Sequence, residues 1–225
     1  MGAIGIEWVN QYNGNASDLN NNDDNARGFY NTLHGTRQFD YGDNLAWDQD
    51  FEKSGKGSPN AGTDTTYIDN VDIAFFSGHG ARDYLLFGRN DRDNAKARNT
   101  EMELGDKDLE WIVFDGCNAL DFNGLWNRWG WGVFKGLHYI LGFATICYDR
   151  KSRGKKFANR LNDGWTMREA WIKACKETEP NATKWAYLRA NEGGITTYND
   201  HWHGKGFVSP DPDNPDMLLY LNGNC

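Results

Sequence analysis

Cysteine, proline and long apolar runs are scarce in this chain of 225 residues. There are five prolines and four cysteines (Cys117, Cys147, Cys175 and Cys225), and no Cys-x-x-Cys spacing occurs. Four separated cysteines do not make the dense disulfide framework of small secreted domains. We therefore expect free thiols and a reducing compartment such as the cytoplasm; a secreted protein whose leading segment has been removed is the alternative.

No apolar run approaches the roughly 20 residues that a membrane-spanning helix needs. Met1 leads almost directly into the apolar stretch 4–9, which is typical of a strand and not of a signal peptide. The chain carries 24 basic and 32 acidic residues, a net charge of −8, and this surface repels phosphate backbones. We expect neither a membrane nor a nucleic-acid partner, and a modest attraction for basic peptides.

Aromatic residues, in contrast, are abundant: the chain has 10 Trp, 10 Tyr and 12 Phe. The mean hydropathy of −0.78 reflects Asn, Asp and Gly in loops, and it does not indicate disorder. A chain of this length can bury a sizeable core, so we expect one domain over 1–225, with a loop-rich part at 193–225.

Strand-like apolar runs alternate with helical patterns along the chain. The predicted strands are 3–10, 37–41, 71–76, 109–114, 139–145 and 185–190. The predicted helices begin near Asp23 and at 154 and 166, whereas 90–103 is expected to be a charged loop without structure. The alternation predicts an α/β fold whose mostly parallel, about six-stranded sheet is covered on both faces.

Two of these strands end in residues that can carry chemistry. The run 71–76 leads into Ser77-Gly78-His79-Gly80, and the run 109–114 leads into Asp115-Gly116-Cys117. Ligands bind at the carboxyl edge of open α/β sheets, and the separation of 38 positions from His79 to Cys117 leaves room for a crossover between parallel strands. We expect a Cys–His dyad there, with the N–H groups of Gly80 and Cys117 as donors to an oxyanion.

The two motifs together resemble those of the caspase-like cysteine peptidase clan, which includes caspases, metacaspases, legumain, gingipain, clostripain and separase. They are most similar to metacaspases, which carry Ser-Gly-His-Gly and Asp-x-Cys at matching places, although Asn118-Ala119-Leu120 replaces the usual His-Ser-Gly. A prokaryotic caspase-like family of unknown function is similar over most of the chain, from Glu7-Trp8-Val9 to Gly204-x-Gly206. The resemblance implies a caspase-like three-layer α/β/α fold and a cysteine endopeptidase that uses Cys117 and His79.

The resemblance also implies a substrate preference. Asp115 lies two residues before Cys117, so in an extended segment both side chains point to the same side. In metacaspases the aspartate at this place helps to bind a basic P1 side chain, which implies cleavage of a peptide or protein substrate after Arg or Lys. Asp83 is a second candidate for substrate binding. The structural alternative is that Asp115 is neutralised by its own backbone or by a resident arginine.

Other features have weaker functional interpretations. His201 and His203 share a face in a strand, but no third ligand is evident, and a surface loop is the preferred interpretation. The acidic clusters 18–24 and 211–216 do not match an EF-hand loop. We therefore predict no metal site and no required cofactor, while the resemblance leaves calcium open because some metacaspases and clostripain use it. Cys147 and Cys175 are interpreted as small core residues.

Two alternatives to a peptidase belong to other functional classes. One is a catalytically silent caspase-like module that binds a peptide or protein partner through the same cleft. The other is a carbohydrate-binding domain built on exposed tryptophans, although aromatic residues are more often part of a core. The oligomeric state is left open by the sequence.

Overall fold

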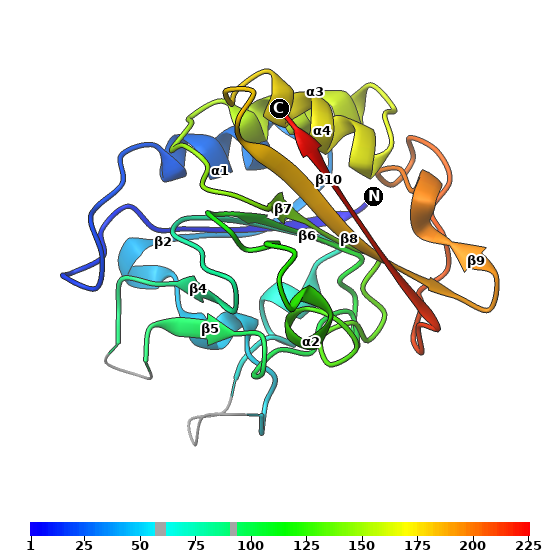
Figure 1. Ribbon diagram of the computed structural model, residues 1–225, viewed down its shortest axis with the longest axis horizontal. Helices are drawn as coiled ribbons and strands as arrows, with labels where there is room; N and C mark the ends of the chain where they lie inside the picture. Colours follow the sequence, from blue (N-terminus) through cyan, green and yellow to red (C-terminus); the bar gives the residue numbers. More distant parts are fainter. Residues whose placement is uncertain (57–61, 91–93) are drawn as a thin grey trace.

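The computed structural model describes residues 1–56, 62–90 and 94–225, which fold around one mixed sheet (Figure 1). The strand order is β10-β8-β7-β6-β3-β1-β2, and β9 pairs with β8. The strands of this sheet are β1 (Ala3–Trp8), β2 (Thr36–Gly42), β3 (Ile73–Ser77), β6 (Trp111–Asp115), β7 (Tyr139–Phe143), β8 (Lys184–Glu192), β9 (Ile195–Thr196) and β10 (Met217–Asn224).

The five strands from β2 to β7 run parallel, whereas β8 is antiparallel to both β7 and β10. This confirms the predicted α/β class and the mostly parallel sheet. The expected number of about six strands was too low, because β10 pairs along the whole length of β8. β10 lies at the edge of the sheet and was not predicted, although its first five residues, 217–221, are apolar or aromatic; this stretch is short and lies in the loop-rich part 193–225.

Three helices cover one face of the sheet: α1 (Asn22–Thr32), α3 (Arg153–Asn162) and α4 (Met167–Lys176) (Figure 1). Their apolar sides meet the sheet in one buried cluster. Within it, the Phe29 ring stacks on Phe75 of β3 at 4.9 Å between ring centroids and on Phe157 of α3 at 5.7 Å. These contacts fix α1 beside the carboxyl end of β3, where His79 follows.

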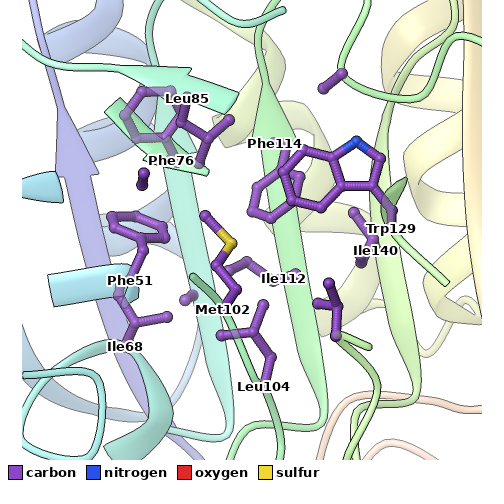
Figure 2. Packing of buried hydrophobic residues seen from close by; sticks show 14 of the residues in the cluster. Phe51, Ile68, Phe76, Leu85, Met102, Leu104, Ile112, Phe114, Trp129 and Ile140 are labelled. Atoms are coloured by element: carbon purple, nitrogen blue, oxygen red, sulfur yellow. The ribbon is translucent and has the colours of Figure 1, made fainter. Parts of the chain in front are cut away.

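Short elements cover the opposite face. They are α2 (Leu125–Arg128), the strand pair β4 (Tyr84–Leu86) and β5 (Lys96–Arg98), and the 3₁₀ helices Asp43–Leu45, Asp48–Phe51 and Ile68–Asn70; a further 3₁₀ helix, Thr197–Asn199, follows β9. Figure 2 shows how Phe51, Phe76, Phe114 and Trp129 fill the space between these elements and the sheet. Both faces of the sheet are therefore covered, but only one of them by long helices.

The prediction that 90–103 has no structure was wrong for its second half. β5 pairs antiparallel with β4, while 91–93 lie outside the described residues. Ala97 is fully buried, and its charged neighbours Lys96 and Arg98 place their cationic groups over the Tyr84 ring. A single small apolar residue between two charges does not resemble a strand in the sequence, although it alternates as a strand does.

The sheet register brings the two chemical motifs together. Ser77, the last residue of β3, pairs with Asp115, the last residue of β6. Because these parallel neighbours end at the same level, the segments with His79 and Cys117 leave the sheet side by side. None of the helices in 1–56, 62–90 and 94–225 is long and apolar enough to cross a membrane.

Candidate active site

The His79 imidazole is fixed by two residues that precede α1. The backbone N–H of His79 donates to the Tyr12 hydroxyl at 2.7 Å, and the centroids of the His79 and Tyr12 rings lie 4.6 Å apart. Its Nε2 atom lies 2.8 Å from the carbonyl oxygen of Ser17. A carbonyl oxygen only accepts hydrogen bonds, so Nε2 carries the proton. In the neutral ring the other nitrogen, Nδ1, is therefore the one able to accept a proton.

Cys117 lies in the turn that follows β6. The next residue, Asn118, has a left-handed backbone (φ 58°), and its N–H donates to the Thr145 carbonyl at the end of β7 at 3.0 Å. This turn places the Cys117 sulfur beside the segment after β7. There Sγ lies 3.4 Å from the backbone nitrogen of Cys147 and 3.9 Å from its Sγ atom.

The two thiols ionise differently. The hydrogen bond from the Cys147 thiol, helped by the Cys147 backbone, lowers the pKa of Cys117 to about 7 against the opposing effects of burial and Asp115. The same hydrogen bond, together with burial, raises the pKa of Cys147 well above the ordinary value. As the pH rises, Cys117 therefore ionises first, around pH 7, while Cys147 stays protonated.

Cys117 and His79 line the same small cavity, with a volume of about 80 Å³, at the carboxyl edge of the sheet. Asp115, Cys147 and Asp149 line it as well. Among the described residues no direct hydrogen bond joins the Cys117 thiol to the His79 ring. Catalytic pairs are often loosely arranged without substrate, so the two groups can act on one molecule that enters the cavity.

The backbones after the two strands approach each other closely. A side chain on Gly80 would place its Cβ only 3.1 Å from the Cys117 carbonyl oxygen and 3.2 Å from the Gly116 carbonyl carbon. Glycine therefore suits this position for steric reasons. In the described part of the chain, neither the Gly80 N–H nor the Cys117 N–H donates a hydrogen bond to another protein group. Both expected oxyanion donors thus remain available.

Asp115 is part of a buried ionic network. Its side chain accepts hydrogen bonds from Arg153 at one oxygen and from Asn25, at 2.7 Å, at the other. Arg153 is only 1% exposed and also pairs with the buried Glu179. Burial raises the pKa of Asp115, and Arg153 and Asn25 oppose that rise. Both Asp115 oxygens already have partners, which argues against the predicted direct contact with a substrate cation.

Asp83, the second predicted substrate-binding residue, lies elsewhere. Its side chain is 48% exposed and 3.7 Å from Arg98 of β5. It does not belong to the residues that line the cavity. The reason is that the chain after Gly80 turns into β4 and carries Asp83 away from the sheet edge, so its nearness in sequence to His79 does not bring it to the cavity.

A different acid, Asp149, lines the cavity. One of its oxygens, Oδ2, accepts the N–H groups of Asn20 at 2.7 Å and Asn21 at 3.1 Å. The other, Oδ1, is shielded from solvent and has no hydrogen-bond partner among the described residues. Asp149 is therefore the carboxylate in this cavity with an unused oxygen.

Residues 6–223 match a protein family described as a domain of unknown function, DUF6345. The chain belongs to this family. No curated protein matches the chain. The family description assigns no activity to this DUF6345 domain.

Sequence reasoning missed four residues of this site. Cys147 was interpreted as a core residue, although it comes soon after the predicted strand 139–145, just as Cys117 comes soon after the predicted strand 109–114. The Ser17 carbonyl gave no signal, because any residue type supplies a carbonyl oxygen. Tyr12 and Asp149 gave none because their roles depend on the tertiary positions of the loops that carry them.

Two groups of side chains in the described ranges have the composition of cation sites: Asp72, Glu110 and His203, and Asp64, Asp69 and Asp106. The first group lies at the amino ends of β3 and β6, opposite the cavity. No third ligand is evident in the sequence, but the structure brings two carboxylates to His203: its Nε2 atom lies 2.6 Å from Asp72 and 3.4 Å from Glu110. His201 does not join this group, since its Nδ1 atom lies 3.3 Å from the Phe207 carbonyl oxygen.

Proposed function

We propose that this DUF6345 domain is a cysteine endopeptidase of the caspase-like clan, with a three-layer α/β/α arrangement. The main support is one observation: a thiol with a lowered pKa and an oriented imidazole line one cavity, at the ends of the neighbouring strands β3 and β6. The helices on one face of the sheet and the short elements on the other are compatible with the three layers.

The proposed reaction is acyl transfer. His79 Nδ1 takes the proton of Cys117, and the thiolate forms a bond to the scissile carbonyl carbon. The Gly80 and Cys117 N–H groups hold the resulting oxyanion. When the peptide C–N bond breaks, the Nδ1 proton goes to the leaving amine. Water activated by His79 then cleaves the thioester and releases the new carboxyl terminus. The Ser17 carbonyl holds the ring in the required tautomer throughout.

We propose cleavage after Arg or Lys, with Asn as the alternative that the likeness to legumain suggests. The cationic side chains at the cavity have partners: Arg153 pairs with Asp115 and Glu179, and Arg150 lies 3.6 Å from Glu179. Asp149 lines the cavity, and its Oδ1 atom has no hydrogen-bond partner among the described residues. A basic side chain that enters the cavity would supply a charged partner for that carboxylate.

The alternatives have less support. Seven of the ten tryptophans are at most 8% exposed (Trp8, Trp47, Trp111, Trp129, Trp171, Trp185 and Trp202), which removes them as platforms for sugars. The silent module shares the fold and the cavity with the peptidase. It has no need for a thiolate at Cys117, and so the lowered pKa of that thiol favours the enzyme.

The test is a library of fluorogenic peptides that differ at P1, assayed on the wild-type chain and on Cys117→Ala. We expect hydrolysis by the wild type, its loss in Cys117→Ala, and a melting temperature that stays nearly the same. The matched control is Cys175→Ala, which removes a buried thiol of α4 and leaves turnover close to wild type. Wild-type turnover by Cys117→Ala would refute the proposal, and peptide binding without hydrolysis by the wild type would favour the silent module.

A further inference from the structure

Cys117 and Cys147 form a pair of neighbouring thiols just beyond the carboxyl ends of two adjacent strands. Cys117 follows β6 and Cys147 follows β7, and these strands pair in parallel. The hydrogen bond from Asn118 to Thr145 at 3.0 Å ties the two segments together. With Sγ atoms 3.9 Å apart, a shift of about 1.9 Å brings the sulfurs to the 2.05 Å of a disulfide.

The two thiols differ in the way that oxidation sensors require. Cys117, with its pKa of about 7, is partly ionised at neutral pH, whereas the raised pKa of Cys147 keeps that residue protonated. A thiolate reacts readily with hydroperoxides, and a neighbouring thiol then traps the product. Both cysteines are partly exposed and line the cavity, so a molecule as small as hydrogen peroxide has access to them.

We propose that Cys117 and Cys147 form a reversible disulfide that switches the site off under oxidation. The Cys117 thiolate attacks hydrogen peroxide, the O–O bond breaks, and sulfenic acid and hydroxide form. The Cys147 sulfur then attacks the sulfenic sulfur: the S–S bond forms, the S–O bond breaks, and the Cys147 proton leaves with the oxygen as water. The two thiols lose two electrons in total, and the peroxide is reduced to water. A dithiol reductant reverses the change by thiol–disulfide exchange.

The disulfide would block the reactivity of the Cys117 sulfur and would also protect that sulfur from further oxidation. A sulfenic acid without a nearby thiol is oxidised further to sulfinic acid, which thiol reductants do not restore. Disulfide formation with Cys147 is favoured over further oxidation, because the Cys147 sulfur already contacts Cys117. The loss of peptidase activity rests on the proposed function, but the formation of the disulfide does not.

The experiment treats the full chain with a small excess of hydrogen peroxide and follows two readouts. Free thiols are counted and peptides are mapped by mass spectrometry without reduction, and peptide hydrolysis is measured before and after addition of dithiothreitol. We expect a Cys117–Cys147 disulfide, loss of two of the four free thiols, and loss of hydrolysis that dithiothreitol restores.

The informative variant is Cys147→Ser, which keeps a hydrogen-bond donor beside Cys117 but cannot form the disulfide. Relative to its own untreated activity, we expect a loss that dithiothreitol does not restore, with sulfinic acid at Cys117. Cys175→Ser is the matched control and keeps the reversible behaviour. Mapping that shows sulfinic acid at Cys117 of the wild type with Cys147 still free, or a disulfide between Cys175 and Cys225 alone, overturns the proposal. If untreated wild type hydrolyses no peptide but the mapped disulfide forms, the peptidase proposal fails and the redox chemistry stands.

Discussion

The carbonyl oxygen of Ser17 accepts the Nε2 proton of His79 at 2.8 Å. This bond comes from a loop before α1, far in sequence from both chemical motifs, and it orients the ring without a carboxylate. A catalytic aspartate would also stabilise the charged imidazole, whereas a neutral carbonyl stabilises it less. The arrangement therefore suits a thiol nucleophile, which ionises near neutral pH and can be deprotonated by a weaker base than a hydroxyl requires.

The first prediction concerns the ionisation of Cys117. Its pKa is lowered from the ordinary value of 9.0 to about 7, so its thiolate appears as the pH rises through 7. Alkylation of Cys117 by iodoacetamide, followed by peptide mapping between pH 5.5 and 9.5, should reach half its maximum near pH 7. The rate of peptide hydrolysis should rise over the same range. Cys175 serves as the internal control, because burial raises its pKa and hides it from the reagent. An alkylation midpoint at or above pH 8.5 would contradict the lowered pKa.

A second prediction concerns the residue that holds the His79 backbone. Tyr12→Phe keeps the buried ring but removes the oxygen that accepts the His79 N–H at 2.7 Å. We expect destabilisation of about 1–3 kcal/mol in urea unfolding, the cost of leaving a shielded donor unpaired, and a reduced kcat. Tyr30→Phe is the control, since the Tyr30 hydroxyl makes no hydrogen bond within the described residues. Equal effects of the two variants on kcat would exclude a positioning role for Tyr12.

The sequence was sufficient for the parts of the fold that are buried on both faces. The strands β3 and β6 read as continuous apolar runs, and their positions placed His79 and Cys117 at one edge. β5 was missed because its two charged residues look like a loop, and β10 because its short apolar stretch, 217–221, lies in a loop-rich part of the chain. The local pattern of apolar residues indicates which residues are buried, but it does not indicate which strands pair with each other.

The same distinction holds for the residues of the site. Residue type and strand position were enough to single out Cys117, His79 and Gly80. Whether Asp115 is open or paired depended on Arg153, which follows it by 38 residues and enters the core from the first turn of α3. No pattern in the sequence marks an arginine that is 1% exposed, since arginine is rarely buried.

The third prediction addresses that arginine. Arg153→Met should destabilise the chain by about 3–5 kcal/mol in urea unfolding, because it leaves the buried carboxylate of Asp115 without its cation and Glu179 with only the more distant Arg150. The loss should shrink at acidic pH, because burial raises the pKa of Asp115 and the penalty for that carboxyl exists only while it is ionised. Arg27→Met, which breaks a surface pair with Asp40 at 2.7 Å, should cost less than about 1 kcal/mol. Similar losses for both variants would show that the buried network contributes no more than the exposed pair.

The fourth prediction assigns substrate preference to Asp149. Asp149→Asn removes the charge of the unused oxygen and keeps the size of the side chain. We expect kcat/KM for peptides with Arg or Lys at P1 to fall by about tenfold or more, the loss of one charge-assisted contact, while other P1 residues change little. Asp83→Asn is the matched control, because Asp83 pairs with Arg98 and does not line the cavity. A basic preference that survives in Asp149→Asn but falls in Asp83→Asn would reverse the assignment.

The last prediction concerns the edge of the sheet opposite the cavity. His138, which precedes β7, is fully buried, with Nδ1 2.5 Å from Asp200 and Nε2 3.1 Å from Asp211. Burial disfavours its charged form, but the two carboxylates outweigh burial and raise the pKa of His138 to about 9 from 6.5. A raised pKa means that the charged ring stabilises the fold fully below about pH 6.5, and that this contribution disappears as the pH rises through 9.

The size of this contribution is on the order of 3 kcal/mol, since each unit of pKa shift corresponds to about 1.4 kcal/mol. His138→Gln should therefore be less stable than the wild type by about that amount at pH 6, and the difference should narrow toward pH 9.5. Urea unfolding of both chains at each pH measures it, and the subtraction removes the titration of His203, whose pKa is also raised to about 9. His34→Gln, at an exposed position, should show no difference at any pH. A His138→Gln difference that is constant from pH 6 to 9.5 would mean that the ring acts by shape and hydrogen bonding alone.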